Sequence, residues 1–331
     1  MRIVEINDIA SVASEIGAGL RARGDSVTLI QPRLVGARLH PWLKPTVSPA
    51  RALEWVQLIR AIRRGDYDLA HIHYAYLGML GVLGRFPFIL HCHGTDLREA
   101  TAVTRPLIAR ALTHADHVFY STPDLAPYVL PVRPDGEFLP NPIDTEVFRP
   151  LSPARDHRDV YICCALTEVK GAGRLLTACR ILAQERPEIR ITAVAQGPYA
   201  AAFGELPNVT LLHRQLRSRL PEIISRHGVV VGWVRFGIAG MAELEALACG
   251  RPVVSWFNQF DAYPELPPFV RAVDGRDIAA AVAQLVDDAG ARERLGRAGR
   301  EWVQRCHPLG QAAGRVHEVS AAIVGRVRAA A

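Results

Sequence analysis

Two glycines stand at the start of a short helical pattern in the stretch FGIAGMAELEALACGRPVV, residues 236–254. Gly237 and Gly240 leave the backbone without side chains where the helix should begin. The unpaired N–H groups of Gly240, Met241 and Ala242 can therefore approach an anion closely, and a diphosphate fits that description. An ordinary helix packed between two strands, with glycine turns at its ends, explains the same residues about as well.

The same helical pattern carries two glutamates. Glu243 and Glu245 are two positions apart, which places them about 200° apart around a helix. Only one of them can face a ligand that binds at the start of the helix.

A second group of polar residues follows an apolar strand pattern in ILHCHGTDLRE, residues 89–99. His93 and Asp96 come at the end of that strand, where parallel sheets bind their ligands. His71, His73 and His91 alternate along two strand patterns, and we predict that they are core or rim histidines with satisfied hydrogen bonds.

Strand-like and helical patterns alternate from the first residue, which predicts parallel sheets covered by helices on both faces. Prolines between residues 131 and 153 break any long helix and mark a linker. We therefore expect an α/β protein of two doubly wound, Rossmann-like domains, residues 1–150 and 151–331, which face a central cleft. The last helix, about residues 312–331, is a candidate to pack back on the first domain.

Composition excludes several classes of protein. The 331 residues carry a net charge of +6, and no apolar run reaches the ~20 residues that cross a bilayer. Met1 is followed by no signal-peptide pattern, so we expect a cytoplasmic protein. The six cysteines lack metal-ligand spacing, and the absence of zinc-finger or aromatic RNA-binding patterns argues against nucleic acid. A nicotinamide-dependent dehydrogenase needs G-x-G-x-x-G after its first strand, whereas Gly17 and Gly19 fall inside the first helix.

Five ordered motifs resemble the retaining, family 4 glycosyltransferases (glycosyl transferases group 1) of the GT-B fold. Their donor-site helix is written E-G-F-G-x-x-x-x-E-A-M-A-x-G-x-P-V-V. The motifs are ELEALACGRPVV at 243–254, HGTDLR at 93–98, LPNPIDTEVFRP at 139–150, EVKGAGRLL at 168–176 and VAQGP at 194–198. The resemblance implies a hexosyltransferase-type enzyme that moves a sugar from a nucleoside diphosphate to a hydroxyl or amine acceptor. It also implies retention of configuration and no need for a metal or other cofactor.

The resemblance assigns donor-binding residues. Glu245 takes the position that binds the ribose hydroxyls, and its two oxygens suit a vicinal diol; Lys170 takes that of a diphosphate-binding lysine. Gly237 and Ala165 stand where the family has a glutamate and an arginine. Because cations stabilise the leaving diphosphate, we expect Arg235 to supply the missing charge. The other expected donor contacts come from Gly197 and, unless they belong to an ordinary surface loop, from His213 and Arg214.

In the amino-terminal half the resemblance places His93 beside the transferred sugar, with Asp96 as a second, weaker catalytic candidate. The reaction needs no protein nucleophile when the leaving phosphate takes the acceptor's proton, so positioning and electrostatics carry catalysis. Asn7, Asp8 and Ser11, in the first strand-to-helix turn, are the acceptor-binding candidates. Helix capping explains these three residues about as well.

The expected partners are a sugar nucleotide and a small-molecule, glycan or lipid acceptor, and the number of subunits is left open. The basic helical pattern at residues 50–65, with Trp55, permits weak peripheral contact at the inner membrane face, although a solvated helix face is favoured. Because Ala165 and Gly237 depart from the family pattern, two alternatives remain. One is a GT-B protein that binds a sugar nucleotide without transfer, and the other is a sugar-nucleotide epimerase or hydrolase of the same fold.

Overall fold

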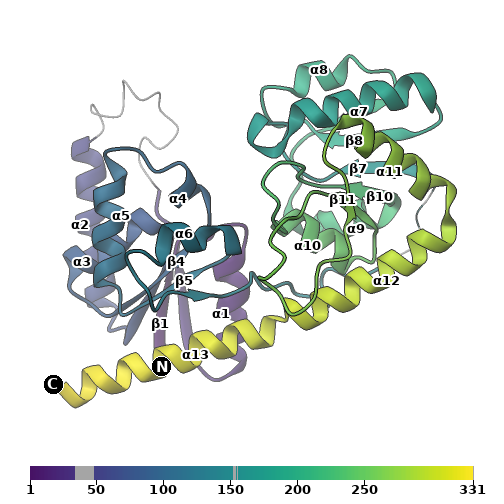
Figure 1. Cartoon of the computed structure of the whole chain (residues 1–331). Coiled ribbons are helices and arrows are strands. Elements are labelled where there is room, and N and C mark those ends of the chain that lie inside the picture. Colours follow the sequence, from purple (N-terminus) through teal and green to yellow (C-terminus); the bar gives the residue numbers. More distant parts are fainter. Residues whose placement is uncertain (34–47, 152–153, 155, 331) are drawn as a thin grey trace. The chain divides into compact units, whose positions relative to one another are not determined.

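The computed structural model describes residues 1–33, 48–151, 154 and 156–330. It divides into two compact units, Met1–Pro142 with Leu309–Ala331, and Ile143–Pro308 (Figure 1). The division follows Pro142 rather than residue 150, because the backbone N–H of Ile143 donates to the His307 carbonyl of the second unit at 3.0 Å.

The first unit is built on a parallel sheet of six strands in the order β2-β1-β3-β4-β5-β6. Strands β3 and β4 are buried along their whole length, as expected for a parallel sheet covered by helices on both faces. The strands are β1 (Arg2–Ile6), β2 (Ser26–Ile30), β3 (Leu69–His73), β4 (Phe88–Cys92), β5 (His117–Tyr120) and β6 (Glu137–Phe138). The helices are α1 (Val12–Ala22), α2 (Ser48–Arg64), α3 (Met79–Gly84), α4 (Thr95–Arg98), α5 (Thr104–His114), α6 (Ala126–Val129) and α13 (Leu309–Ala330).

The C-terminal helix α13 belongs to the first unit and lies along α1 (Figure 1). A Cβ on Gly19 of α1 would lie 2.5 Å from the Cβ of Ala313, so glycine permits this close approach. Arg23 Nη2 donates to the Gly310 carbonyl at 2.7 Å, and His317 contacts Asp25 at 2.6 Å.

The proline-rich stretch that we expect to be a linker contributes a strand to the first unit. Residues Glu137 and Phe138 form β6, which pairs in parallel with Phe119 and Tyr120 of β5. The prolines around them exclude a long helix but leave the N–H groups of this pair free to join the sheet.

The second unit repeats the architecture with a six-stranded parallel sheet in the order β12-β11-β10-β7-β8-β9. Its strands are β7 (Asp156–Ile162), β8 (Arg190–Val194), β9 (Val209–Leu212), β10 (His227–Val231), β11 (Val253–Ser255) and β12 (Val270–Arg271). Its helices are α7 (Ala172–Glu185), α8 (Ala200–Gly204), α9 (Leu220–Arg226), α10 (Met241–Ala248), α11 (Gly275–Asp287) and α12 (Ala289–Cys306). Helices α7 and α11 and the central strands share one continuous apolar core.

Each sheet reverses its strand order at one point. In the first unit the reversal lies between β1 and β3, and in the second between β7 and β10. Loops that leave such a point in opposite directions open a crevice at the carboxyl ends of the strands, where doubly wound folds bind ligands. These two switch points position the candidate residues.

The basic helix α2 is not long and apolar enough to cross a membrane, and neither is any other helix in the part of the chain that the structure describes. Trp55 of α2 is partly buried and stacks on Tyr76, with the ring centroids 6.1 Å apart. Its ring therefore packs against its own unit.

Candidate functional site

The loops after β7 and β10 converge at the switch point of the second unit. The β7 loop ends in the short 3₁₀ turn η5 (Glu168–Lys170), and the β10 loop leads into α10. Val234 N–H donates to the Lys170 carbonyl at 3.4 Å, and Arg174 Nη1 donates to the Val234 carbonyl at 2.6 Å. The two loops that carry most of the expected donor contacts are thus joined to each other.

Helix α10 begins as the glycine spacing predicts, with Gly240 as its N-cap. Met241 and Ala242 are partly exposed, so the N–H groups of the first turn, which have no acceptor within the helix, can meet a ligand. The eight-residue helix ends at Ala248, and Gly250 follows with φ +67°. This left-handed residue is a common helix stop.

Glu243 supports the start of α10 from inside the fold. It is fully buried, and its carboxylate accepts from the Trp233 N–H. A Cβ on Gly240 would lie 2.8 Å from Glu243 Oε2, so the carboxylate folds back toward the N-cap as in a capping box. Burial raises the pKa of Glu243, and the Trp233 N–H and nearby Lys170 oppose that rise.

Lys170 lies across the face of the Trp233 indole, with Nζ 2.7 Å from the ring centroid. The aromatic face attracts the ammonium and holds it beside the start of α10. The lysine is partly exposed, so an anion can approach its ammonium at the same place.

Arg235 lies on the neighbouring loop and contacts Glu168. Its Nη1 donates to Glu168 Oε1 at 2.7 Å and to the Glu168 carbonyl at 3.0 Å, while Tyr199 donates to the other carboxylate oxygen. The Arg235 side chain is 46% exposed, and exposed ion pairs contribute only ~0–1 kcal/mol. Leaving Glu168 for a diphosphate would therefore cost little.

Glu245 points away from Glu243, toward Arg217 in the 3₁₀ turn η6 (Arg217–Arg219). Arg217 Nε donates to Glu245 Oε1 at 2.8 Å, and its guanidinium lies over the Phe148 ring at 4.7 Å. Burial raises the pKa of Glu245, and Arg217 opposes that rise. The sequence interpretation missed Arg217, although it lies only three residues beyond Arg214 in the loop expected to contact the base.

Gly237 has a backbone conformation that explains the departure from the family pattern. Its φ is +70°, which a glutamate would adopt only with strain, and a Cβ there would overlap the Asn258 side chain. Ala165, at the position of the missing arginine, is partly exposed after β7. A glutamate at position 237 would therefore be strained in this loop.

The remaining donor candidates lie on exposed loops. Gly197 has φ +115°, and a Cβ there would overlap the Leu166 carbonyl, so this loop needs glycine to approach the β7 loop. His213 and Arg214 follow β9 and are exposed. The structure gives them no closer link to Lys170 or α10.

A cavity of about 550 Å³ in the second unit lies elsewhere. Asp156, Gly228 and Pro252 line it, at or next to the amino ends of β7, β10 and β11. Because ligands of this fold bind at the carboxyl ends, this cavity is not the candidate site.

The acceptor candidates of the first unit lie in a loop with unusual backbone angles. Asn7, Ala10 and Ser11 have φ values of 71°, 50° and 66°, and Tyr74 after β3 has φ 98°. Such left-handed residues cost about 1–3 kcal/mol each and gather at functional sites. The strained loops flank the switch point between β1 and β3.

The side chains of that loop already hold the fold. Asn7 is buried and donates through Nδ2 to the His73 carbonyl at 3.0 Å. Asp8 accepts from the Ser14 N–H and hydroxyl in the first turn of α1, whereas Ser11, the N-cap, makes no side-chain capping bond. Capping thus accounts for Asp8, whereas Ser11 is a partly exposed residue whose side chain makes no capping hydrogen bond.

His93 ends a chain of hydrogen bonds that starts in the core. Glu5 Oε2 lies 2.8 Å from His73 Nε2, and His73 Nδ1 lies 2.8 Å from His93 Nε2. Burial lowers the pKa of His93 well below its usual range, and neighbouring His73 adds to the effect. A partly buried, neutral imidazole with one nitrogen fixed by a partner is oriented for contact with a ligand.

Asp96 positions the loop that carries His93. Its buried carboxylate accepts from the backbone N–H groups of Ala75, His93 and Gly94, the last at 2.6 Å. Burial raises the pKa of Asp96, and these hydrogen bonds oppose the rise. With so many backbone donors, this carboxylate is suited to hold His93 rather than to exchange a proton.

His71, His73 and His91 are fully buried, as expected for core histidines, but their hydrogen bonding differs from the prediction. One ligand atom from each lies within 4.8 Å of those of the others. Both ring nitrogens of His91 and Nε2 of His71 lack a hydrogen-bond partner in the structure as described. The histidines form a cluster in which several nitrogens are unsatisfied.

Family models match both halves of the chain. Residues 9–147 match Glycosyltransferase Family 4, and residues 157–288 match Glycosyl transferases group 1. A GDP-mannose-dependent α-(1-6)-phosphatidylinositol monomannoside mannosyltransferase of Mycobacterium tuberculosis is 29% identical over 197 residues, 50% of this chain and 51% of that protein. That match thus spans about half of the relative's length. D-inositol 3-phosphate glycosyltransferase of Kribbella flavida is 26% identical over 342 aligned residues, 87% of this chain and 80% of that protein.

Solved structures share the fold over nearly the whole chain. Sucrose-phosphate synthase from Thermosynechococcus elongatus has a TM-score of 0.76 at 18% identity, with both chains covered completely. Anabaena HepE in complex with UDP-glucose has a TM-score of 0.73 at 13% identity and covers 97% of this chain and 100% of its own. The chain has two parallel six-stranded sheets, and the two family models match successive parts of it. It therefore belongs to the Family 4 and group 1 glycosyltransferases and has the GT-B fold.

Proposed function

We propose that this glycosyltransferase takes a hexose from a nucleoside diphosphate carrier and transfers it with retention of configuration to a hydroxyl-bearing or amine-bearing acceptor. The observation that carries the proposal is the grouping of Lys170, the open first turn of α10 and Glu245 at the switch point of the second unit. An ammonium and helix N–H groups match a diphosphate, and a carboxylate one turn further matches ribose hydroxyls.

In this proposal Lys170 and the N–H groups of Met241 and Ala242 hold the diphosphate and stabilise the charge that grows on it as the sugar leaves. Glu243 holds the loop and does not touch the ligand. The ribose shares Glu245 with Arg217, whose Nε donates to Glu245 Oε1 at 2.8 Å. Arg235 swings from Glu168 to the second phosphate.

The first unit supplies the contacts to the sugar and the acceptor in this proposal. His93 lies beside the transferred sugar, in the orientation that His73 and Asp96 impose. Ser11 and the strained turn around it contact the acceptor. No bound metal takes part in the transfer.

Calorimetry on the full chain tests the donor site. UDP, GDP and ADP are titrated first, followed by UDP-glucose and GDP-mannose, which the names of the neighbour and the relative suggest as probes. One nucleotide should bind to the wild type and bind more weakly to Glu245→Ala. Equal affinity of both proteins for every nucleotide would refute the assignment of Glu245.

A product assay separates transfer from its alternatives. With the nucleotide sugar that binds, inositol and inositol phosphates are the first acceptors to test, as suggested by the relatives' names. A glycosylated product indicates transfer and its anomeric configuration tests retention. Free sugar without any product indicates hydrolysis, an altered sugar nucleotide indicates epimerisation, and binding without turnover favours the non-transferring alternative that Ala165 and Gly237 suggest.

A further inference from the structure

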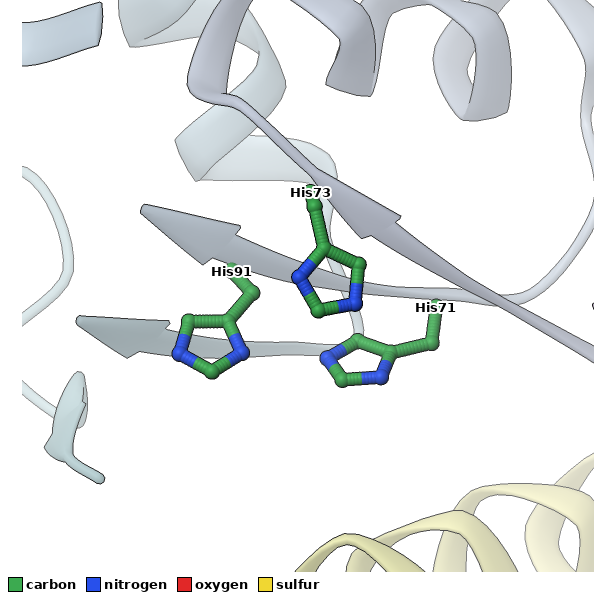
Figure 2. A group of neighbouring side chains, drawn as sticks. All are labelled: His71, His73 and His91. Atoms are coloured by element: carbon green, nitrogen blue, oxygen red, sulfur yellow. The ribbon is translucent and has the colours of Figure 1, made fainter. Parts of the chain in front are cut away.

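Three histidines of the first unit lie together on one face of its sheet. His71 and His73 come from β3 and His91 from β4, and His73 and His91 are register partners. Figure 2 shows the three rings on the side of the sheet that faces the pale yellow ribbon of α13, with a nitrogen of His91 and one of His71 turned toward each other below His73. One nitrogen from each ring lies within 4.8 Å of the others.

The cluster contains more unsatisfied polar atoms than a stable core tolerates. His71 Nε2, His91 Nδ1 and His91 Nε2 are buried without a hydrogen-bond partner among the described residues. Each unsatisfied buried group costs about 1–3 kcal/mol, and native cores contain few of them. Three such atoms at one place indicate a bound species that accepts lone pairs from imidazole nitrogens.

Glu5 on β1 fixes the direction of two of these rings. Its carboxylate lies 3.0 Å from His71 Nδ1 and 2.8 Å from His73 Nε2. When those nitrogens donate to Glu5, His71 Nε2 and His73 Nδ1 retain their lone pairs. A carboxylate behind a histidine is the usual second partner of a metal-binding imidazole.

We propose that His71, His73 and His91 bind one divalent transition-metal ion, zinc in preference to magnesium or calcium, with Glu5 orienting His71 and His73. Imidazole nitrogen suits zinc, whereas magnesium and calcium prefer oxygen ligands. Tetrahedral ligands at ~2.1 Å from zinc are about 3.4 Å apart, so the ligand nitrogens, which lie within 4.8 Å of one another, draw together by at most about 1.4 Å. His73 Nδ1 exchanges its 2.8 Å contact with His93 for the metal.

The cluster lies inside the first unit, where the side chains of His71, His73 and His91 are fully buried. The ion would tie β1, β3 and β4 together at the switch point. It would act on the stability of the first unit, and it would leave the orientation of His93 to Asp96 alone.

The test measures metal binding by the full chain without a polyhistidine tag, after treatment with a chelator. Equilibrium dialysis against Zn²⁺ with elemental analysis gives the stoichiometry, and Co²⁺ titration gives the visible d–d spectrum of the site. The variants are His71→Gln, His91→Gln and Glu5→Gln. His117→Gln is the matched control, because His117 lies on β5 of the same sheet and contacts Glu137 rather than the cluster.

We expect one equivalent of Zn²⁺ in the wild type and in His117→Gln. Both cluster variants should bind at least 10-fold more weakly, and Glu5→Gln about 10–100-fold more weakly, as for other residues that orient a ligand. Zn²⁺ should also raise the melting temperature of the wild type and of His117→Gln, but not that of His91→Gln.

Three results would overturn the proposal. The first is wild-type binding no tighter than that of His71→Gln or His91→Gln. The second is a thiolate charge-transfer band with Co²⁺, which would assign the ion to cysteine. The third concerns the case in which circular dichroism shows that His91→Gln does not fold. Glu5→Gln then tests the proposal, and Zn²⁺ affinity equal to that of the wild type in this variant would overturn it.

Discussion

The two units place different chemistry at equivalent points of one topology. At the β1–β3 switch point, the buried carboxylate of Glu5 makes its hydrogen bonds to the imidazoles of His71 and His73. At the β7–β10 switch point, an ammonium and open helix N–H groups lie at a partly exposed edge. The fold therefore provides the location, while the residue types decide which chemical groups are gathered there.

The two switch points also respond to pH in opposite directions. Burial lowers the pKa values of His73, His91 and His93 in the folded chain. The unfolded chain therefore binds more protons below about pH 6.5, and the folded state loses stability as the pH falls. In the second unit burial raises the pKa values of Glu243 and Glu245. Their contribution to stability is complete below about pH 4.5 and is lost as the pH rises through the raised values.

The largest expected effect separates turnover from binding. His93→Ala should lower the turnover number by about 100-fold, as for other losses of positioning, and leave nucleotide affinity unchanged. Single-turnover kinetics and calorimetry on the same preparation measure the two quantities. An equal loss in both would mean that the first unit also holds the donor, and wild-type turnover would remove His93 from the site.

The converse is expected in the second unit. Lys170→Ala should weaken binding of the nucleoside diphosphate by about 10–100-fold, because a charged contact to phosphate contributes ~1.5–3 kcal/mol. Arg180→Ala is the matched control, since this exposed cation lies further along the same segment, on α7. If both variants bind equally well in calorimetry, the diphosphate lies elsewhere.

Restoring the family residue at position 237 should harm the protein. Gly237→Glu forces a side chain into a left-handed conformation and onto Asn258, and should reduce the free energy of unfolding by about 1–3 kcal/mol. Denaturant unfolding measures the change, and Gly310→Ala, at a helical position where an added Cβ would meet nothing within 4 Å, is the control. A more stable Gly237→Glu with tighter nucleotide binding would show that the loop keeps the family geometry.

The smallest expected effect tests the opposite pH responses. Thermal unfolding with chelator present is followed from pH 4.5 to 8 for two conservative variants. His91→Gln should reduce the loss of stability on acidification below pH 6.5, and Glu243→Gln should reduce the loss on raising the pH above 4.5. Identical pH profiles in both variants and the wild type would mean that neither buried group is linked to folding.

Much of the fold follows from local pattern. The alternation of strands and helices, the start of α10 at Gly240 and its end before Gly250 depend on residues close in sequence. The division after Pro142 and the strand β6 were not predicted, because they arise from pairing with distant segments. Local proline content indicates where helices cannot form, and it does not show which sheet a short extended pair will join.

In the candidate site, too, the sequence indicates residues within one segment but not their partners from distant segments. The motifs identify Lys170 and Glu245, but they do not reveal that Arg217 pairs with Glu245 or that Glu168 pairs with Arg235. Those partners come from other loops, and their side chains meet only when the parallel strands are in register.

The sequence by itself determined two doubly wound halves, the family and the glycine-initiated helix α10, because each depends on periodicity or on motifs within one segment. Only the tertiary structure decided that Glu243 supports a loop, that Asp96 binds backbone N–H groups, and that three histidines form one cluster. The physical reason is that the role of a buried polar group depends on its hydrogen-bond partners. Sheet register brings those partners together from strands that lie far apart along the chain.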